Sequence, residues 1–491
     1  MSERPEQMSV VQASHPSPVS HAPFSARHPW WRIAILCLLL LLSVVLYIIL
    51  ISATPRSDNL ITPFLHVWML CFLPYFVACA FVLATRPPVG RWRWIELGII
   101  LSGALIFRIM LLPLPPGLSH DSWRYPWDAR VLLHGYSPYV YAPSDKVLLP
   151  LRDSLLYTNS RFRNVPTIYP PGAEAIYVLS YLLAPSNLYF LKGIFIVFDM
   201  VTCGALALLL KRKGLDPRRV IIYAWCPLPI VEFAVQGHVD VITLTFTILA
   251  VVSAANTRSG GRVLTGILIG LATLTKIYPI LLLVVIARRR DYALFAACFI
   301  TIIVGYLPFL ILGHGQAFGY FTIYASEQGQ NAGVTQLLVQ WLGGRSHIPL
   351  TTIIMIEHVV DVVLVSVVSL VVLILRQRDR ITIEAGVLVL FGVVLSISSH
   401  VFPWYTTTLL LWVPLLLRKA SIGTNLAIVA IWYFSCTSIL SYFFNAAPNW
   451  TLYYRLVYDP VILVLGVAAI IGIVYLFIHV PGRIDHAGQQ T

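Results

Sequence analysis

The stretch IAILCLLLLLSVVLYIILISA, residues 33–53, decides the class of fold. It contains no charged residue, and its length suits a helix that crosses about 30 Å of hydrocarbon, which takes about 20 residues. The run is also too long for the apolar core of a signal peptide. We therefore expect it to be retained as the first membrane span.

Comparable apolar runs recur along the whole chain of 491 residues, of which 58% are hydrophobic and only 11% are charged. About a quarter of the residues are charged in an ordinary soluble protein. A membrane span must satisfy its own backbone hydrogen bonds, which favours helices. The sequence therefore predicts an all-α integral membrane protein with about 12 to 14 transmembrane helices. The expected spans are 33–53, 61–85, 94–113, 188–210, 219–235, 238–255, 263–287, 291–313, 349–375, 381–399, 404–417, 423–445 and 456–479.

The net charge of +13 follows the expected topology. Cytoplasmic loops of membrane proteins carry an excess of Lys and Arg. With the N-terminus in the cytoplasm, most basic clusters fall on that side, so the charge orients the protein and we expect no nucleic-acid partner. These clusters are Arg86, Arg91 and Arg93, then Lys211 to Arg219, Arg288 to Arg290, Arg376 to Arg380, and Arg418 with Lys419.

Three parts follow from this pattern: a disordered cytoplasmic tail at 1–29, a polytopic membrane domain at 30–480 and a second cytoplasmic tail at 481–491. Within the domain, 114–187 is expected to be a large extracytoplasmic loop. Its apolar stretch 172–184 is too short for a comfortable crossing, so we expect a helix that lies at the membrane interface. The run 263–287 is broken by a Lys-Ile-Tyr-Pro sequence and is expected to form two half-helices that return to the same side.

The outer loop opens with SHDSWRYPWDAR, residues 119–130, which gathers acids, arginines and aromatics at the bilayer edge. Charge in this position indicates catalysis. Asp121 is either a catalytic group or a helix cap that pairs with Arg124, and Asp128 either orients a substrate or pairs with the same arginine. Arg124 and Arg130 suit phosphate oxygens or, alternatively, lipid headgroups.

Several further residues are candidates for substrate binding, and each has a simpler structural reading. The aromatic residues of the loop could hold a sugar or an isoprenoid chain, or could form an interfacial belt. His238 and Asp240 could line a cavity or cap a helix, and Lys276 could hold a lipid phosphate or extend to the cytoplasmic interface. The full candidate set comprises His120, Arg124, Tyr125, Trp127, Arg130, Tyr139, Tyr169, His238, Asp240, Lys276, Tyr278, His400, Trp404 and Tyr405. Arg152, Arg161 and Arg163 are further candidates for phosphate contact, although a solvated face is favoured for them.

Short motifs spread over residues 94–420 resemble those of the GT-C glycosyltransferases that use polyprenyl-phosphate sugars. The resemblance extends to bacterial α-mannosyltransferases and to the catalytic subunit of GPI mannosyltransferase I. An aspartate in the first large outer loop is followed, in the family's order, by several short sequences. They are Trp127-Asp128-Ala129-Arg130, Gly135-Tyr136-Ser137-Pro138-Tyr139, Tyr169-Pro170-Pro171, Gly237-His238-Val239-Asp240, Lys276-Ile277-Tyr278-Pro279 and Pro403-Trp404-Tyr405.

The resemblance implies a GT-C-type helical bundle that transfers a hexose, with mannose favoured, from a polyprenyl-phosphate donor to a lipid-linked or cell-envelope acceptor. It places the site on the extracytoplasmic face, in a bacterial plasma membrane, and implies inversion at the anomeric carbon. Asp121 corresponds to the family's general base, and apolar surroundings would raise its pKa towards a useful range. Asp128 is the second catalytic candidate.

His120 stands where bacterial relatives often carry a second acid. We therefore expect no metal bridged by paired carboxylates, although a divalent cation, Mg or Mn, stays an open alternative. The same residue leaves open a catalytically inactive relative. The rival from another class is a transporter or flippase for lipid-linked saccharides, which would be expected to show polar residues at mid-membrane and internal repeats.

Overall fold

The computed structural model describes residues 30–54, 61–324, 327, 329, 331–344, 349–417 and 422–479. Both predicted tails lie outside these residues. The described chain is helical throughout and contains no strand. Eight of its helices are long and apolar enough to cross a membrane, so the prediction of a multi-pass helical membrane protein is confirmed.

The long spans correspond to the longest apolar runs of the sequence. They are α1 (Trp30–Ser52), α2 with α3 (Ile61–Leu70 and Phe72–Ala84), α4 (Arg91–Leu111), α8 (Leu188–Arg212), α14 (Tyr292–Leu312), α17 (Leu350–Gln377), α21 with α22 (Ile422–Thr437 and Leu440–Ala446) and α23 (Trp450–His479). Shorter apolar helices are α11 (Asp240–Ser253), α12 (Ser259–Thr273) and α18 (Ile383–Ser396).

Two of the expected spans, 219–235 and 404–417, are interrupted. The first forms η4 (Pro217–Val220), α9 (Ile221–Ala224) and α10 (Pro227–Ala234), and the second forms α19 (Pro403–Leu410) and α20 (Val413–Leu416). Proline at the start of α10 and near the start of α20 has no backbone N–H to continue the preceding helix. These segments lie in the centre of the core, where neighbouring helices surround them.

The expected pair of half-helices is present between 259 and 286. After α12, the backbone breaks and continues as η5 (Tyr278–Leu281) and α13 (Leu282–Ile286). The guanidinium of Arg262, at the start of α12, donates to the Ile286 carbonyl and pairs with Asp291. Both ends of the piece therefore meet, and the break at Lys276 lies at its far end.

A buried ion network joins the ends of α1, α4 and η4. Glu96 accepts a hydrogen bond from Nε of Arg32 at 2.7 Å and also pairs with Arg218. Arg218 pairs in addition with Asp216, at 2.6 Å. Arg32 and Arg218 also donate to Thr85, through its hydroxyl and its carbonyl respectively.

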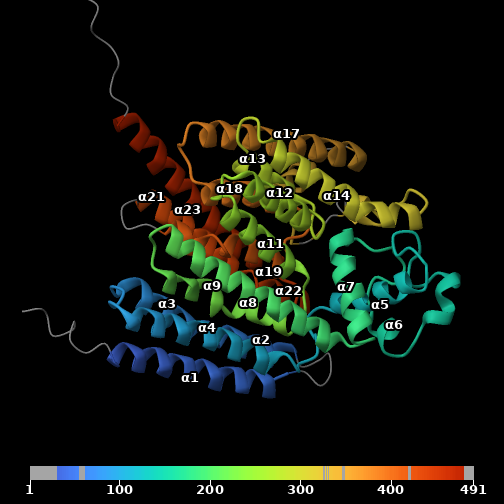
Figure 1. Cartoon of the computed structure of the whole chain (residues 1–491), viewed down its shortest axis with the longest axis horizontal. Coiled ribbons are helices and arrows are strands. Elements are labelled where there is room, and N and C mark those ends of the chain that lie inside the picture. Colours follow the sequence, from blue (N-terminus) through green and yellow to red (C-terminus); the bar gives the residue numbers. More distant parts are fainter. Residues whose placement is uncertain are drawn as a thin grey trace, which may run out of the picture.

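The loop that follows α4 forms a separate layer at the opposite end of the bundle, on the right in Figure 1. It contains α5 (Asp121–Leu133), η3 (Lys146–Leu151), α6 (Leu156–Asn159) and α7 (Pro171–Leu183). In Figure 1, α7 runs across the direction of α1, α4 and α8, as expected for an interfacial helix. The start of α1 and the end of α23 both lie at the other end.

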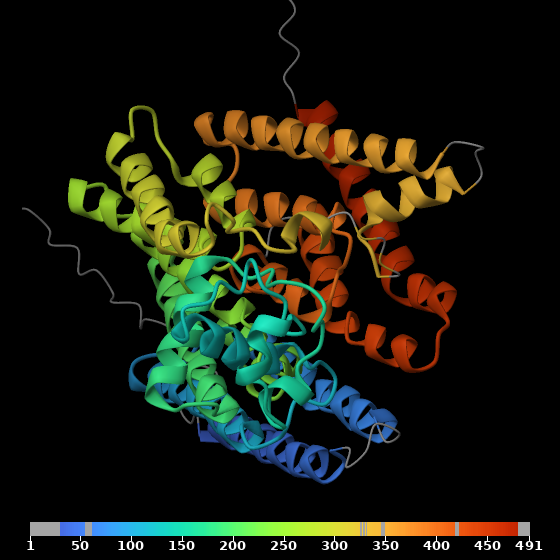
Figure 2. The same cartoon turned by 90° about the vertical axis from the view of Figure 1, so that its right-hand side faces the viewer.

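Two short helices lie in the outer loop 314–348, where the sequence predicted none. They are α15 (Phe321–Tyr324) and α16 (Val334–Gly343). Viewed from the end that carries α5, they lie between that layer and α17 (Figure 2). Tyr324, the last residue of α15, and Tyr320 just before that helix line the candidate site.

Candidate active site

The segment between α4 and α5 is held by side chains from the centre of the bundle. Lys192 donates from Nζ to the carbonyls of Leu112 and Leu114, at 2.8 and 2.6 Å. The amide oxygen of Gln236 accepts from the backbone N–H groups of Leu118 and Ser119, at 3.0 and 3.2 Å. These bonds fix the entry into α5, so that the helix begins at a defined place with Asp121.

The neighbouring Gly237 is required by its backbone. Its φ of +71° lies in the left-handed region, and a Cβ atom there would approach the Cγ of Lys192 to 3.0 Å. The tight turn brings Gln236 towards the start of α5 and starts α11 at Asp240. This one turn therefore positions Ser119, through Gln236, as well as Asp240, and both of these residues line one cavity.

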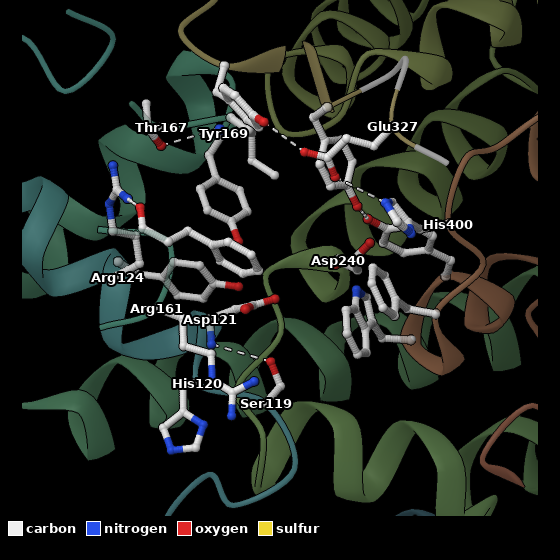
Figure 3. A pocket seen from close by; sticks show the side chains of 18 of the residues that line it. Ser119, His120, Asp121, Arg124, Arg161, Thr167, Tyr169, Asp240, Glu327 and His400 are labelled. Atoms are coloured by element: carbon white, nitrogen blue, oxygen red, sulfur yellow. Dashed lines mark hydrogen bonds and ion pairs between the residues drawn. The ribbon is translucent and has the colours of Figure 1, made fainter. Parts of the chain in front are cut away.

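The first cavity has a volume of about 280 Å³ and lies between α5, the break at Lys276 and the start of α19. Figure 3 shows Asp121 and Arg161 on one side and Glu327 and His400 on the other, with Asp240 between them. Ten of the sequence-predicted site residues line this cavity. They are His120, Asp121, Arg124, Tyr125, Tyr169, Asp240, Lys276, His400, Trp404 and Tyr405.

Two charge pairs occupy the wall opposite Asp121. Lys276 lies 3.4 Å from the Oδ1 of Asp240, and its ammonium sits 4.9 Å from the centre of the Tyr405 ring. His400 lies 3.3 Å from the Oε2 of Glu327. Lys276 therefore faces the cavity, at the end of this piece away from Arg262 and Asp291.

Asp121 makes no ion pair with any described residue, and its backbone N–H donates to the Ser119 hydroxyl at 3.3 Å. Burial raises the pKa of its carboxyl group above the ordinary value. Ser119, Lys276 and Arg161 oppose this shift, whereas the negative charge of Asp240 adds to it. The result is a carboxylate of increased basicity that faces an enclosed space.

Aromatic rings form much of the remaining wall. Phe402 and Trp404 are stacked, with ring centres 4.5 Å apart, and Tyr324 and Tyr405 join their hydroxyl groups at 3.0 Å. On the α5 side, Tyr125 stacks on Tyr177 at 4.4 Å. Such flat, partly polar surfaces suit a sugar ring, which presents both apolar C–H groups and hydroxyl groups.

A second cavity of about 400 Å³ adjoins the first. Tyr169, Asp240, Lys276 and Tyr405 line both. The rest of the second cavity includes an apolar wall of Phe391, Val394 and Leu395 from α18, and also His358 and Asp361 from α17. Tyr278, the eleventh predicted residue found in either space, lines the second cavity. Lys276 and Asp240 thus stand at the junction of the two cavities.

Residues 167–399 match the family model named Glycosyltransferase family 87. The match covers a little under half of the chain and includes Tyr169, Asp240 and Lys276, but neither Asp121 nor Trp404. No curated protein matches the chain. The similarity to family 87 supports a membrane glycosyltransferase, which is the coarse form of the expectation drawn from the short motifs.

Asp128, which precedes the matched residues 167–399, lines neither cavity. It is buried and pairs through Oδ1 with the Nε of Arg124 at 2.6 Å. Arg124 then donates to the carbonyls of Phe162 and Val165. In the structure, Asp128 therefore pairs with Arg124 and does not face the cavity. Through Arg124, it supports the cavity wall that contains Phe162 and Val165.

Four other predicted residues also lie outside both cavities. Trp127 of α5 is buried in a small apolar cluster with Leu148 and Leu156. The Tyr139 hydroxyl donates to the Tyr169 carbonyl at 2.7 Å. Arg130 pairs with Asp153 at 2.7 Å and donates to Tyr181 and Ser186. His238 bonds Glu232 at 3.0 Å through Nδ1 and packs on Trp404 at 3.7 Å, so it lies behind the aromatic wall.

The cavity also contains residues that sequence reasoning missed. Tyr320, Tyr324 and Glu327 come from a loop that carried no motif, and Tyr442 and Asn445 come from α22. Arg161, which the sequence offered as a further candidate, lines the cavity as well and is exposed.

The described residues place no group of three His, Cys, Asp or Glu side chains where a metal ion could be held. The acids of the cavity, Asp121, Asp240 and Glu327, lie among the cations Lys276 and Arg161 and beside His400. These residues do not fit a metal bridged by paired carboxylates. No step below is therefore assigned to a metal.

Proposed function

We propose that this protein transfers a hexose, with mannose the first candidate, from a polyprenyl-phosphate donor to a lipid-linked or cell-envelope acceptor on the extracytoplasmic side. The observation that carries the proposal is the placement of Asp121 across one cavity from the Lys276–Asp240 pair, at the junction with the second cavity. The similarity to family 87 supports glycosyl transfer as the type of reaction.

In the proposed reaction, an acceptor hydroxyl group attacks the anomeric carbon while the bond from that carbon to the phosphate oxygen breaks. The carboxylate of Asp121 takes the hydroxyl proton as general base, and the raised pKa makes it a better proton acceptor. Polyprenyl phosphate leaves, and attack from the face opposite the leaving group inverts the anomeric carbon.

Lys276 is proposed to stabilise the negative charge on the leaving phosphate. Asp240 and Tyr405 hold its ammonium group at the junction of the two cavities. The apolar wall from α18 offers a surface for the prenyl chain, and the stacked Phe402 and Trp404 offer one for a sugar. Each part of the donor therefore has a chemically suitable partner.

The test is transfer of radiolabelled mannose from synthetic polyprenyl-phosphate mannose to membrane lipids by the purified protein. We expect Asp121→Asn to lower the rate by about 10²- to 10⁴-fold, the usual contribution of a general base. Asp145→Asn is the matched control, because this loop acid lines neither cavity and bonds the Ala142 N–H instead.

Full activity in Asp121→Asn would contradict the assignment of the base. Absence of transfer by the wild-type protein with mannose, glucose and arabinose donors would contradict the proposed reaction and favour a flippase.

A further inference from the structure

The loop 160–165 forms the outer mouth of the first cavity. A surface hollow lined by Tyr157 and residues 160–165 meets the cavity at Arg161, Phe162 and Val165, which line both. In Figure 1 this part of the chain, next to α6, lies on the side of α5 away from the long spans. Residues 161–164 are exposed, so this mouth lies at the surface of the structure.

The backbone of this mouth is held in an unfavourable shape. Phe162 has a φ of +53°, in the left-handed region that costs a non-glycine residue about 1 kcal/mol or more. Its side chain is 69% exposed. Arg124 donates to the carbonyls of Phe162 and Val165, and buried Asp128 fixes Arg124 in turn. A buried ion pair thus maintains an exposed apolar ring at the mouth.

Positive charge gathers at the same mouth. Arg161 and Arg163 flank Phe162 in the chain, and Arg163 and Arg152 place their guanidinium groups 5.2 and 4.8 Å from the centre of the Tyr157 ring. The seven residues that line the hollow include no Asp or Glu. Arginine pairs with phosphate and carboxylate through parallel hydrogen bonds, so this surface is suited to an anion.

We propose that Arg161, Phe162 and Arg163 bind the acceptor, and that the acceptor carries an anionic group, a phosphate or a carboxylate, near the hydroxyl group that receives the sugar. This inference rests on the proposed function. Arg161 would contact the anion from within the cavity that contains Asp121, Arg163 would contact it from outside, and Phe162 would cover an apolar sugar face. The donor would then approach from the second cavity and the acceptor from the mouth.

The test is a binding assay that needs no turnover. The full chain in phosphatidylcholine nanodiscs is titrated with a fluorescent dodecyl mannoside, with its 6-phosphate and with its 6-carboxylate. We expect at least one anionic probe to bind about tenfold more tightly than the neutral one. Arg161→Gln with Arg163→Gln should remove this preference without weakening the neutral probe, and Arg161→Lys with Arg163→Lys should restore part of it.

The matched control is Lys146→Gln, which removes an exposed cation of the same loop that lines neither the cavity nor the hollow. It should leave the preference intact. A preference that survives the double Gln substitution, or that is equally lost in the control, would overturn the inference. Phe162→Ala should weaken all three probes by the same factor, and unchanged binding of all three would count against its role.

Two further arms distinguish the source of the anion. Equal loss of undecaprenyl phosphate binding in the double Gln variant would assign these arginines to the donor and overturn the inference. Loss of the preference for the anionic probes in phosphatidylglycerol nanodiscs would assign the two arginines to lipid headgroups, which would also overturn the inference. Because binding is the readout, failure here with intact mannose transfer leaves the proposed function standing. Absence of transfer with an intact anion preference would contradict the proposed function, and with it the acceptor role, but not the anion site itself.

Discussion

The two ends of the bundle both gather charged residues, but they use them differently. At the end where α1 and η4 meet, the carboxylate of Glu96 is fully buried and bonded to two arginines. At the outer end, Asp121 makes no ion pair within the described chain and faces a cavity. A charge that is fully paired within the protein can support the fold, whereas one that faces a cavity can act on a substrate.

The comparison also applies within the single helix α5. Asp121 and Asp128 lie two turns apart on α5, and both were candidates for catalysis. Asp128 is buried against Arg124, while Asp121 opens the helix at the cavity. The difference arises from what lies beside each acid, because Arg124, which the 160–165 loop holds, pairs with Asp128, whereas Asp121 lines the cavity.

The largest effect on stability is expected from breaking the inner network. Glu96→Gln leaves two buried guanidinium groups without their shared charge, so the free energy of unfolding should fall by about 3–5 kcal/mol. Denaturant titration in detergent measures this. The control is Lys213→Gln, whose pair with Glu384 is 42% exposed on the lysine side and should contribute less than about 1 kcal/mol. Asp121→Asn, which loses activity, should unfold like the wild-type protein.

The next effect concerns the junction of the two cavities. Lys276→Met keeps the length of the side chain but removes the ammonium group beside Asp240. A charge-assisted hydrogen bond to phosphate contributes about 1.5–3 kcal/mol, so kcat/KM for the donor should fall by about 10- to 100-fold. Steady-state kinetics with varied donor measure it, and Arg376→Met, at the inner end, is the control for removal of a cation. An unchanged kcat/KM in Lys276→Met would remove this residue from the phosphate site.

Most of the fold could be predicted from the sequence because hydrophobic length is a local property. The apolar length of residues 33–53 predicts a helix without reference to the rest of the chain. The Tyr-Pro sequence after Lys276 predicts a break because proline lacks the backbone N–H that would continue the helix. The interrupted segments α9 with α10 and α19 with α20 were harder, since full burial by neighbours allows short helices with breaks that an isolated span would not tolerate.

The site could be predicted only in part, because a cavity is formed by segments far apart in the chain. Asp121, Asp240 and Lys276 each stood out as charges at the edge of, or within, apolar runs. Glu327 and Tyr324 carry no such local signal, and they reach the cavity through contacts with His400 and Tyr405, which are more than seventy residues away in the sequence. Whether Asp128 pairs with Arg124 or faces a substrate depends on the 160–165 loop, which is more than thirty residues away in the sequence.

A smaller effect should separate the two acids of α5. Asp128→Asn retains an acceptor for Arg124 but loses the charge, so the free energy of unfolding should fall by about 1–2 kcal/mol. The acid limb of the pH–activity profile should keep its position, since the base is unchanged. Thermal unfolding and the pH profile are measured together. A loss of activity as large as that of Asp121→Asn, in a protein of normal stability, would make Asp128 catalytic.

The smallest expected effect is a displacement of that acid limb. Burial raises the pKa of Asp121, so activity should be lost, as pH falls, at a higher pH than an ordinary aspartate would give. The positive charge of Arg161 lowers this pKa, so Arg161→Gln should raise it further and move the acid limb of kcat/KM to higher pH. Lys146→Gln should not move it. A limb that moves downwards in Arg161→Gln would show that another group, and not Asp121, must lose its proton before transfer.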